Sequence, residues 1–62
     1  MPNIYGPHIK AVRVERGIKA AYVARRLQIS SPTYSEIESG KRGVSAERLD
    51  AILTLIGLPM KI

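Results

Sequence analysis

Cations are the side chains in this sequence most able to do chemistry, and they are unevenly placed along the chain. The 62 residues include ten Lys and Arg but only five Asp and Glu, which gives a formal net charge of +5. Between Lys10 and Arg26 there are six basic residues and one acid, Glu15. Because lysine and arginine attract anions, this excess predicts a polyanionic partner, either a nucleic acid or an acidic membrane surface. The alternative is a charge that serves only solubility.

The other polar residues give little support to catalysis or metal binding. The chain has no cysteine, which excludes disulfides and thiolate metal sites, and His8 is its one histidine. Neither a nucleophile–base pair nor a pair of carboxylates can be recognised in the sequence. The sequence therefore predicts a protein that is not an enzyme and that needs no metal or other cofactor.

The length and the apolar pattern limit the architecture. Residues 1–62 are enough for one small domain, and no apolar stretch approaches the roughly 20 residues that span a bilayer. The first four residues, MPNI, lack the layout of a signal peptide. We therefore expect a cytoplasmic domain. Because small domains without disulfides often associate, we also expect a dimer.

Four short helices are predicted from apolar spacing and from start and stop signals. Ser30 and Ser45 are favoured helix N-caps, and Pro32 fits the first turn of a helix. The predicted helices are 7–16, 20–27, 31–38 and 45–56, followed by a tail, 58–62. Because only three residues separate the second helix from the third, these two must cross steeply. The pattern predicts an all-α compact bundle. Its apolar stripes are needed for a core, which disfavours binding to a membrane surface.

Two consecutive segments carry a family pattern. Residues 17–30 read GIKAAYVARRLQIS, and residues 34–42 read YSEIESGKR. In this order and spacing they resemble the helix-turn-helix of phage repressors and Cro proteins, also called Xre-like, and the resemblance extends over roughly residues 9–58. It implies a bundle of four to five short helices in which the predicted third helix enters the major groove of DNA. An α-helix fits this groove, and its N-terminal residues can reach base edges.

The resemblance assigns base reading to the predicted third helix. The family's reading positions fall on Ser31, Pro32 and Glu36, with Thr33 and Ser35 beside them. Serine and threonine can bond to several bases, and the Glu36 carboxylate can accept a hydrogen bond from the amino group of cytosine. In the alternative interpretation, Pro32 only starts the helix, Ser35 packs, and Glu36 is a solvated surface acid.

Phosphate contacts are implied for cations and hydroxyl groups that flank this helix. They are Lys19, Tyr22, Ser30, Ser39, Lys41 and Arg42. Such groups add affinity without choosing a sequence. Tyr22 is equally compatible with packing, and Lys41 and Arg42 with a solvated loop.

The sequence departs from the family pattern at two places. Lys19 and Ala20 stand where a Ser or Thr followed by Gln usually opens the second helix, which makes Lys19 a substitute for the usual contact. Gln28 stands where a glycine usually separates the two helices. A residue with a side chain can adopt the left-handed conformation there at some cost, so we expect a turn that is either slightly strained or of a different shape.

The resemblance also implies an ion pair between Arg13 and Glu38. In this family an arginine of the first helix often pairs with a glutamate at the end of the third. Charge-assisted hydrogen bonds of this kind would tie the reading helix to the scaffold. We therefore predict that both residues are structural and do not contact DNA.

The C-terminal tail predicts a dimer interface. Apolar residues alternate with others in residues 58–62, and a strand of five residues needs a partner. A second copy of the tail is the simplest partner, so we expect a short C-terminal strand that pairs in a dimer. Together with one residue of the last helix, the predicted interface consists of Leu55, Leu58, Met60 and Ile62.

These observations lead to two hypotheses on function. The first is a homodimeric, sequence-specific transcriptional regulator, most simply a repressor, that binds double-stranded DNA at a palindromic operator. It is either a phage regulator or the antitoxin of a toxin–antitoxin operon, which adds a toxin protein as a partner. The alternative is a protein-interaction module that has kept the helix-turn-helix fold and no longer binds DNA.

Overall fold

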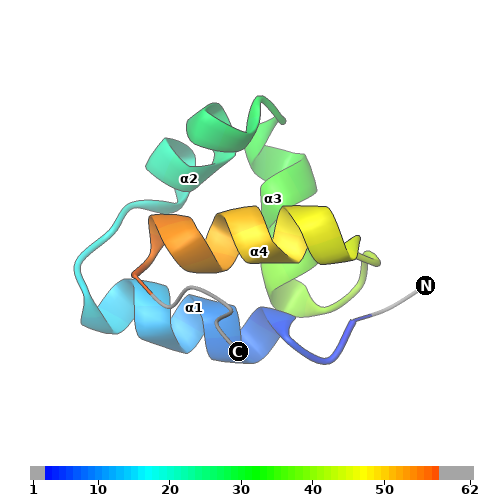
Figure 1. Cartoon of the computed structure of the whole chain (residues 1–62), viewed down its shortest axis with the longest axis horizontal. Coiled ribbons are helices and arrows are strands. Elements are labelled where there is room, and N and C mark those ends of the chain that lie inside the picture. Colours follow the sequence, from blue (N-terminus) through cyan, green and yellow to red (C-terminus); the bar gives the residue numbers. More distant parts are fainter. Residues whose placement is uncertain (1–2, 58–62) are drawn as a thin grey trace.

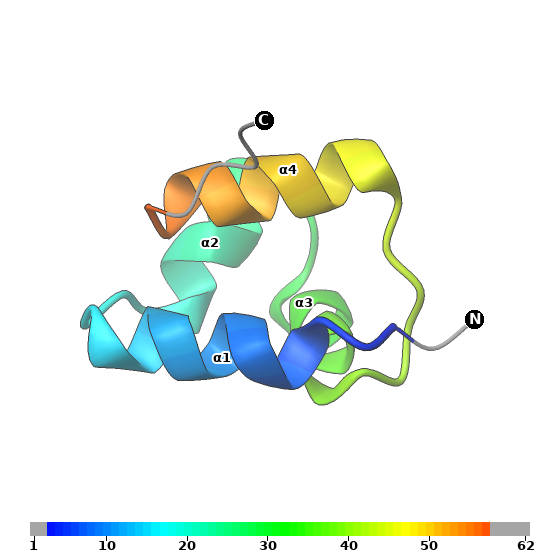
Figure 2. The same cartoon turned by 60° about the horizontal axis from the view of Figure 1, so that its bottom comes forward.

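The computed structural model describes residues 3–57, which form four α-helices and no strand. These helices are α1 (Gly6–Glu15), α2 (Ala20–Leu27), α3 (Ser31–Ser39) and α4 (Ala46–Leu55). In both views α1 and α4 run in roughly the same direction, and α3 crosses them steeply (Figures 1 and 2). Helix α3 packs against α1 and α2, and α2 also packs against α4. The all-α bundle predicted from the sequence is therefore confirmed.

The helix ends lie within one residue of the predicted ends. Helix α1 begins at Gly6 instead of residue 7 and ends at Glu15, while α3 extends to Ser39. Helix α4 begins after its N-cap Ser45 and ends at Leu55. Differences of this size are expected because the residues at a helix end make only part of the helical hydrogen bonds. The predicted tail 58–62, with its strand and with Leu58, Met60 and Ile62, lies outside the described residues.

The core draws on all four helices and on the residue that follows α4. Tyr34 and Ile52 have no exposed surface, and the aliphatic residues around them are almost as fully buried. The buried hydrophobic residues are Ile9, Val23, Ala24, Tyr34, Ile37, Leu49, Ile52 and Ile56. Burying apolar surface is the main favourable term in folding, so this cluster fixes how the helices pack.

Leu55, a predicted dimer contact, belongs partly to the protein's own core. Its side chain is partly buried and packs against the core cluster, as does that of Leu53. A second copy could therefore reach only a part of the Leu55 surface. The sequence pattern placed Leu55 off the apolar stripe because it did not account for packing around the end of the helix.

Helix α1 begins in direct contact with the end of α3. A Cβ atom at Gly6 would overlap the backbone carbonyl oxygens of Ile37 and Glu38. Only glycine lets the two backbones approach so closely. The start of α1 is thus a support for the C-terminal end of α3.

Candidate nucleic-acid interface

Local capping and amphipathic spacing explain how α3 forms. The Ser30 side chain caps the helix by accepting a hydrogen bond from the Thr33 N–H at 3.2 Å, and its hydroxyl donates to Thr33 Oγ1 at 2.8 Å. Pro32 lies in the first turn, where a backbone donor is not needed. At the other end Gly40 takes a left-handed conformation, with φ of 84°, which stops the helix.

One side of α3 is buried and the other is exposed. Tyr34, Ile37 and Glu38 face the core. Four of the predicted base-reading residues are exposed: Ser31, Pro32, Ser35 and Glu36. The fifth, Thr33, is half-buried. Helix α3 therefore presents short polar side chains to solvent along its length while its apolar residues hold it in place.

The turn between α2 and α3 sets the direction of α3. Gln28 has φ of 61° and ψ of 40°, and it is the one non-glycine residue with positive φ among residues 3–57. Its N–H donates to the Arg25 carbonyl, and the Ile29 N–H donates to the Ala24 carbonyl, which closes the end of α2. The sequence left open whether Gln28 takes the left-handed conformation or the turn has another shape, and the structure shows the left-handed conformation. It turns the chain sharply enough for α3 to cross α2 after three residues.

Arg13 and Glu38 form a buried ion pair that ties α1 to α3. Arg13 Nε donates to Glu38 Oε2 at 2.6 Å, and Nη2 donates to Oε1 at 3.0 Å. Arg13 Nη1 also donates to the carbonyl of Ile18, in the loop before α2, at 2.7 Å. Glu38 is only 5% exposed, so its carboxylate is directed into the protein. The hydrogen bond to Glu38 raises the pKa of Arg13, which stays charged throughout the ordinary pH range.

Tyr34 lies in the core beside this pair. Its side chain has no exposed surface, and its hydroxyl has no hydrogen-bond partner among the described residues. Burial raises the pKa of Tyr34 well above the ordinary tyrosine value, and the nearby Glu38 carboxylate adds to the effect. Tyr34 is therefore a packing residue of α3.

Asn3 is a positioning residue that the sequence analysis missed. Its Oδ1 accepts hydrogen bonds from the N–H groups of Tyr5 (2.8 Å) and Gly6 (2.7 Å), which satisfies donors at the start of α1. Its Nδ2 donates to the carbonyls of Ile37 (3.1 Å) and Arg42 (2.7 Å). One amide group thus joins the start of α1, the end of α3 and the following loop. The available signal was an asparagine three residues before the first helical residue, a spacing suited to accepting N–H bonds.

Glu36 and Arg42 are paired on the surface, although the sequence analysis gave them separate roles. Arg42 Nε donates to Glu36 Oε1 at 2.9 Å, and Arg42 Nη2 donates to the same oxygen at 2.8 Å. Both side chains are about half exposed. The pair joins the exposed side of α3 to the loop after it.

The other predicted phosphate contacts lie on two sides of α3, which stands between α2 and the loop 40–45 in both views (Figures 1 and 2). On one side, Lys19 is the exposed N-cap of α2. Tyr22 is 43% exposed, and its hydroxyl accepts a hydrogen bond from Arg26 Nη1 at 3.2 Å. On the other side, Lys41 is exposed. Ser39 is the last residue of α3 itself, and its hydroxyl donates to the Glu36 carbonyl at 3.0 Å. The Ser39 and Ser30 hydroxyls therefore each serve a hydrogen bond within the protein.

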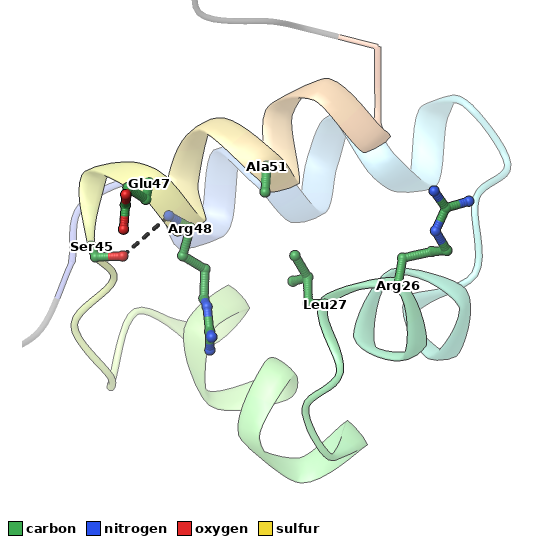
Figure 3. A pocket seen from close by; sticks show the side chains of 6 residues that line it. All are labelled: Arg26, Leu27, Ser45, Glu47, Arg48 and Ala51. Carbon is green, nitrogen blue, oxygen red and sulfur yellow. Dashed lines mark hydrogen bonds between the residues drawn. The ribbon is translucent and has the colours of Figure 1, made fainter.

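A shallow groove lies between the C-terminal half of α2 and the N-terminal half of α4 (Figure 3). Its volume is about 310 Å³, and its lining residues are Arg26, Leu27, Ser45, Glu47, Arg48 and Ala51. Leu27 and Ala51 occupy its middle in Figure 3, and the two arginines lie toward opposite ends. Ser45 caps α4 by accepting from the Arg48 N–H at 3.1 Å. None of these residues was singled out as a site residue from the sequence.

Two other kinds of feature are missing from the described part of the chain. No three His, Cys, Asp or Glu side chains in residues 3–57 are grouped so that they could hold a metal ion. Within the same residues, every helix is too short or too polar to cross a membrane.

The family comparison agrees with this geometry. A sequence model of the helix-turn-helix family matches residues 9–62, which include α2, the left-handed turn at Gln28, α3 and α4. No curated protein and no solved structure matches the chain significantly. The chain belongs to the helix-turn-helix family, in its phage-repressor and Cro (Xre-like) type, a family of DNA-binding regulators.

Proposed function

We propose that this protein is a sequence-specific transcriptional regulator that places α3 in the major groove of DNA. The observation that carries the proposal is the division of α3 into a buried side, which holds Tyr34 and Ile37, and an exposed side of short polar groups. Short side chains let the helix backbone come close to base edges, and hydroxyls and a carboxylate supply the acceptors and donors that bases require. The base-reading residues are Ser31, Pro32, Thr33, Ser35 and Glu36.

Cations on both sides of α3 supply the electrostatic part of binding. Lys19 opens α2, and Lys41 begins the loop after α3. Tyr22 can donate its hydroxyl proton to a phosphate oxygen, and Ser30 and Ser39 can do so once their hydroxyls turn away from Thr33 Oγ1 and the Glu36 carbonyl. These contacts fix the register of the protein on the duplex, while the α3 side chains choose the sequence.

We further propose that the regulator acts as a homodimer on a palindromic operator, with half-sites about one helical turn apart. The exposed part of Leu55, together with Leu58, Met60 and Ile62, forms the interface. Occupation of a promoter is sufficient for repression, which makes a repressor the simplest regulator of this kind. Sedimentation velocity at micromolar concentration tests the interface, because a monomer with and without operator DNA would contradict it.

The DNA-binding proposal is tested with randomised 24-base-pair duplexes. We expect selection for one motif with two-fold symmetry. We also expect an affinity that falls with salt, with a slope of about −0.9 for each phosphate contacted. Lys41→Ala should reduce the magnitude of that slope by about 0.9. Lys10→Ala removes the same charge from the exposed surface of α1 and should leave the slope unchanged.

The contrary outcome is no binding to any duplex at low salt. It would favour the alternative function, a protein-interaction module, which the replacement of the usual helix-two residues by Lys19 and Ala20 supports. Co-purification with the product of the neighbouring gene separates an antitoxin, which requires a toxin partner, from a phage regulator.

A further inference from the structure

An acidic side chain on the exposed surface of α3 is difficult to reconcile with DNA binding unless its charge is compensated. In the major groove, the carboxylate of Glu36 would lie between two rows of phosphates, which repel it. The Glu36–Arg42 pair supplies this compensation inside the protein, since both charges lie on the same surface and are joined by two hydrogen bonds.

We propose that Arg42 is a positioning residue for Glu36 and acts on DNA through that carboxylate instead of through a phosphate. The pair then works as one unit that selects a single base pair of the operator, a cytosine facing Glu36. This inference rests on the proposed function, because it assumes that α3 reads the major groove.

The hydrogen-bond pattern of the pair leaves one carboxylate oxygen free. Both Arg42 donors, Nε and Nη2, go to Glu36 Oε1. Among the described residues, Oε2 accepts no hydrogen bond. Two hydrogen bonds to one oxygen restrict the rotation of the carboxylate. Its second oxygen remains available to accept a hydrogen bond from the cytosine amino group.

The backbone of Arg42 is fixed independently of its side chain. The Glu36 carbonyl accepts from the N–H groups of Lys41 (3.1 Å) and Arg42 (3.3 Å), and the Arg42 carbonyl accepts from Asn3 Nδ2 at 2.7 Å. The loop is therefore held on both sides of Arg42 without the guanidinium. Truncation of the side chain should leave the loop in place, so its effects on DNA binding report the guanidinium alone.

The charge balance separates the two possible roles of Arg42. A free arginine that neutralises a phosphate releases counterions and contributes to the salt dependence of binding. An arginine already paired with Glu36 forms a neutral unit and contributes little. Lysine could replace arginine at a phosphate, but it cannot place two donors in a fixed plane on one carboxylate oxygen.

The experiment measures the affinity of the full chain for its selected duplex and for every single-base variant of it, over a range of salt concentrations. The proteins are wild type, Glu36→Gln, Arg42→Ala, Arg42→Lys and the double variant Glu36→Gln/Arg42→Ala. We expect Glu36→Gln and Arg42→Ala to relax discrimination at the same base pair, each by on the order of ten-fold. The double variant should relax discrimination at this base pair no further than either single change. The salt slope of the double variant should equal that of wild type, because a neutral pair is replaced by two neutral side chains.

Arg42→Lys is the decisive variant. We expect it to relax base discrimination as much as Arg42→Ala does, because lysine keeps the charge but cannot make the two hydrogen bonds that hold Glu36 Oε1. The matched control Lys41→Ala should reduce the magnitude of the salt slope by about 0.9 and leave the base preference unchanged.

Three outcomes would overturn the inference. They are a salt slope whose magnitude falls by about 0.9 in the double variant, full base discrimination in Arg42→Lys, and relaxed discrimination at different base pairs in the Glu36 and Arg42 variants. A surface pair stabilises a fold little, so the melting temperature of every variant should stay near that of wild type. If wild type itself selects no duplex, the proposed function fails; if wild type selects a motif and Arg42→Lys keeps full discrimination, only the role of Arg42 fails.

Discussion

The Arg13 guanidinium donates to both carboxylate oxygens of Glu38, in a pair whose side chains are 11% and 6% exposed. This pair connects the last turn of α1 to the last turn of α3. The same guanidinium also binds the Ile18 carbonyl, in the segment that leads into α2. The position of the reading helix thus depends on a residue of a different helix, 25 positions earlier in the chain.

Arg13→Ala should destabilise the fold by about 3 kcal/mol, because it leaves the Glu38 carboxylate buried without its partner. Urea denaturation of the two proteins measures the difference. Arg42→Ala, which breaks the exposed pair with Glu36, is the control and should cost less than about 1 kcal/mol. Equal stability of Arg13→Ala and wild type would mean that the pair does not hold α1 to α3.

Asn3→Ala should cost about 1–2 kcal/mol, since it removes the acceptor for the N–H groups of Tyr5 and Gly6 and both hydrogen bonds to carbonyls near the end of α3. Asn3→Asp separates the two contributions. It keeps the oxygen that accepts from Gly6 but turns a second oxygen toward the carbonyls of Ile37 and Arg42. We expect Asn3→Asp to be at least as unstable as Asn3→Ala in thermal melts. A near-native Asn3→Asp would assign the stabilisation to the hydrogen bonds from Tyr5 and Gly6 alone. Ile4→Ala, at an 84% exposed neighbour, is the control.

Gln28→Gly should stabilise the protein by about 0.5–1 kcal/mol. The left-handed conformation costs a residue with a side chain about 1–2 kcal/mol, and glycine avoids this cost while losing more entropy on folding. Gln28→Ala keeps the cost and should melt close to wild type. A lower melting temperature for Gln28→Gly than for Gln28→Ala would show that the Gln28 side chain makes a compensating contact.

The stability of the protein should fall above about pH 10, and Tyr34 should be one cause. Its raised pKa means that the folded state retains a proton that the unfolded state loses above pH 10. The contribution is complete below this pH and is lost as the pH rises, with a slope approaching 1.4 kcal/mol per pH unit.

Chemical denaturation between pH 8 and 11 tests the role of Tyr34. Tyr34→Phe should remove this part of the slope and should be as stable as wild type at pH 7, because the buried hydroxyl has no partner among the described residues. Tyr22→Phe, which removes a tyrosine hydroxyl from an exposed position, is the matched control. An identical slope in Tyr34→Phe and wild type would contradict the assignment.

Much of the secondary structure was predictable because its signals are local. Ser30 and Ser45 cap α3 and α4 as the sequence indicated, and glycines follow α3 and α4. The left-handed turn at Gln28 was one of two shapes left open by the sequence, because the resembled family usually has a glycine at that position. The serine caps and the glycines involve atoms only a few residues apart, so residue type and order are sufficient to specify them.

The exposure of residues on α3 was predictable, but the pairing of Glu36 with Arg42 was not. The exposure of Ser31, Ser35 and Glu36 follows from helical periodicity once Tyr34 and Ile37 are recognised as core residues. The pairing of Arg42 with Glu36 depends on the path of the loop after Gly40, which helical spacing does not describe. The same limit applies to Leu55, whose partial burial depends on its neighbours in space.

The amino-acid sequence by itself determined the helix-turn-helix family, the four helices and the cationic character of the chain. Only the tertiary structure decided that Glu36 is held by Arg42 and that Asn3 joins α1 to the loop after α3, whereas the family resemblance had already implied the pair between Arg13 and Glu38. The physical reason is range. Caps and periodicity act within a few residues, whereas hydrogen bonds between Asn3 and Arg42 or between Arg13 and Glu38 exist only after the core has brought distant segments together.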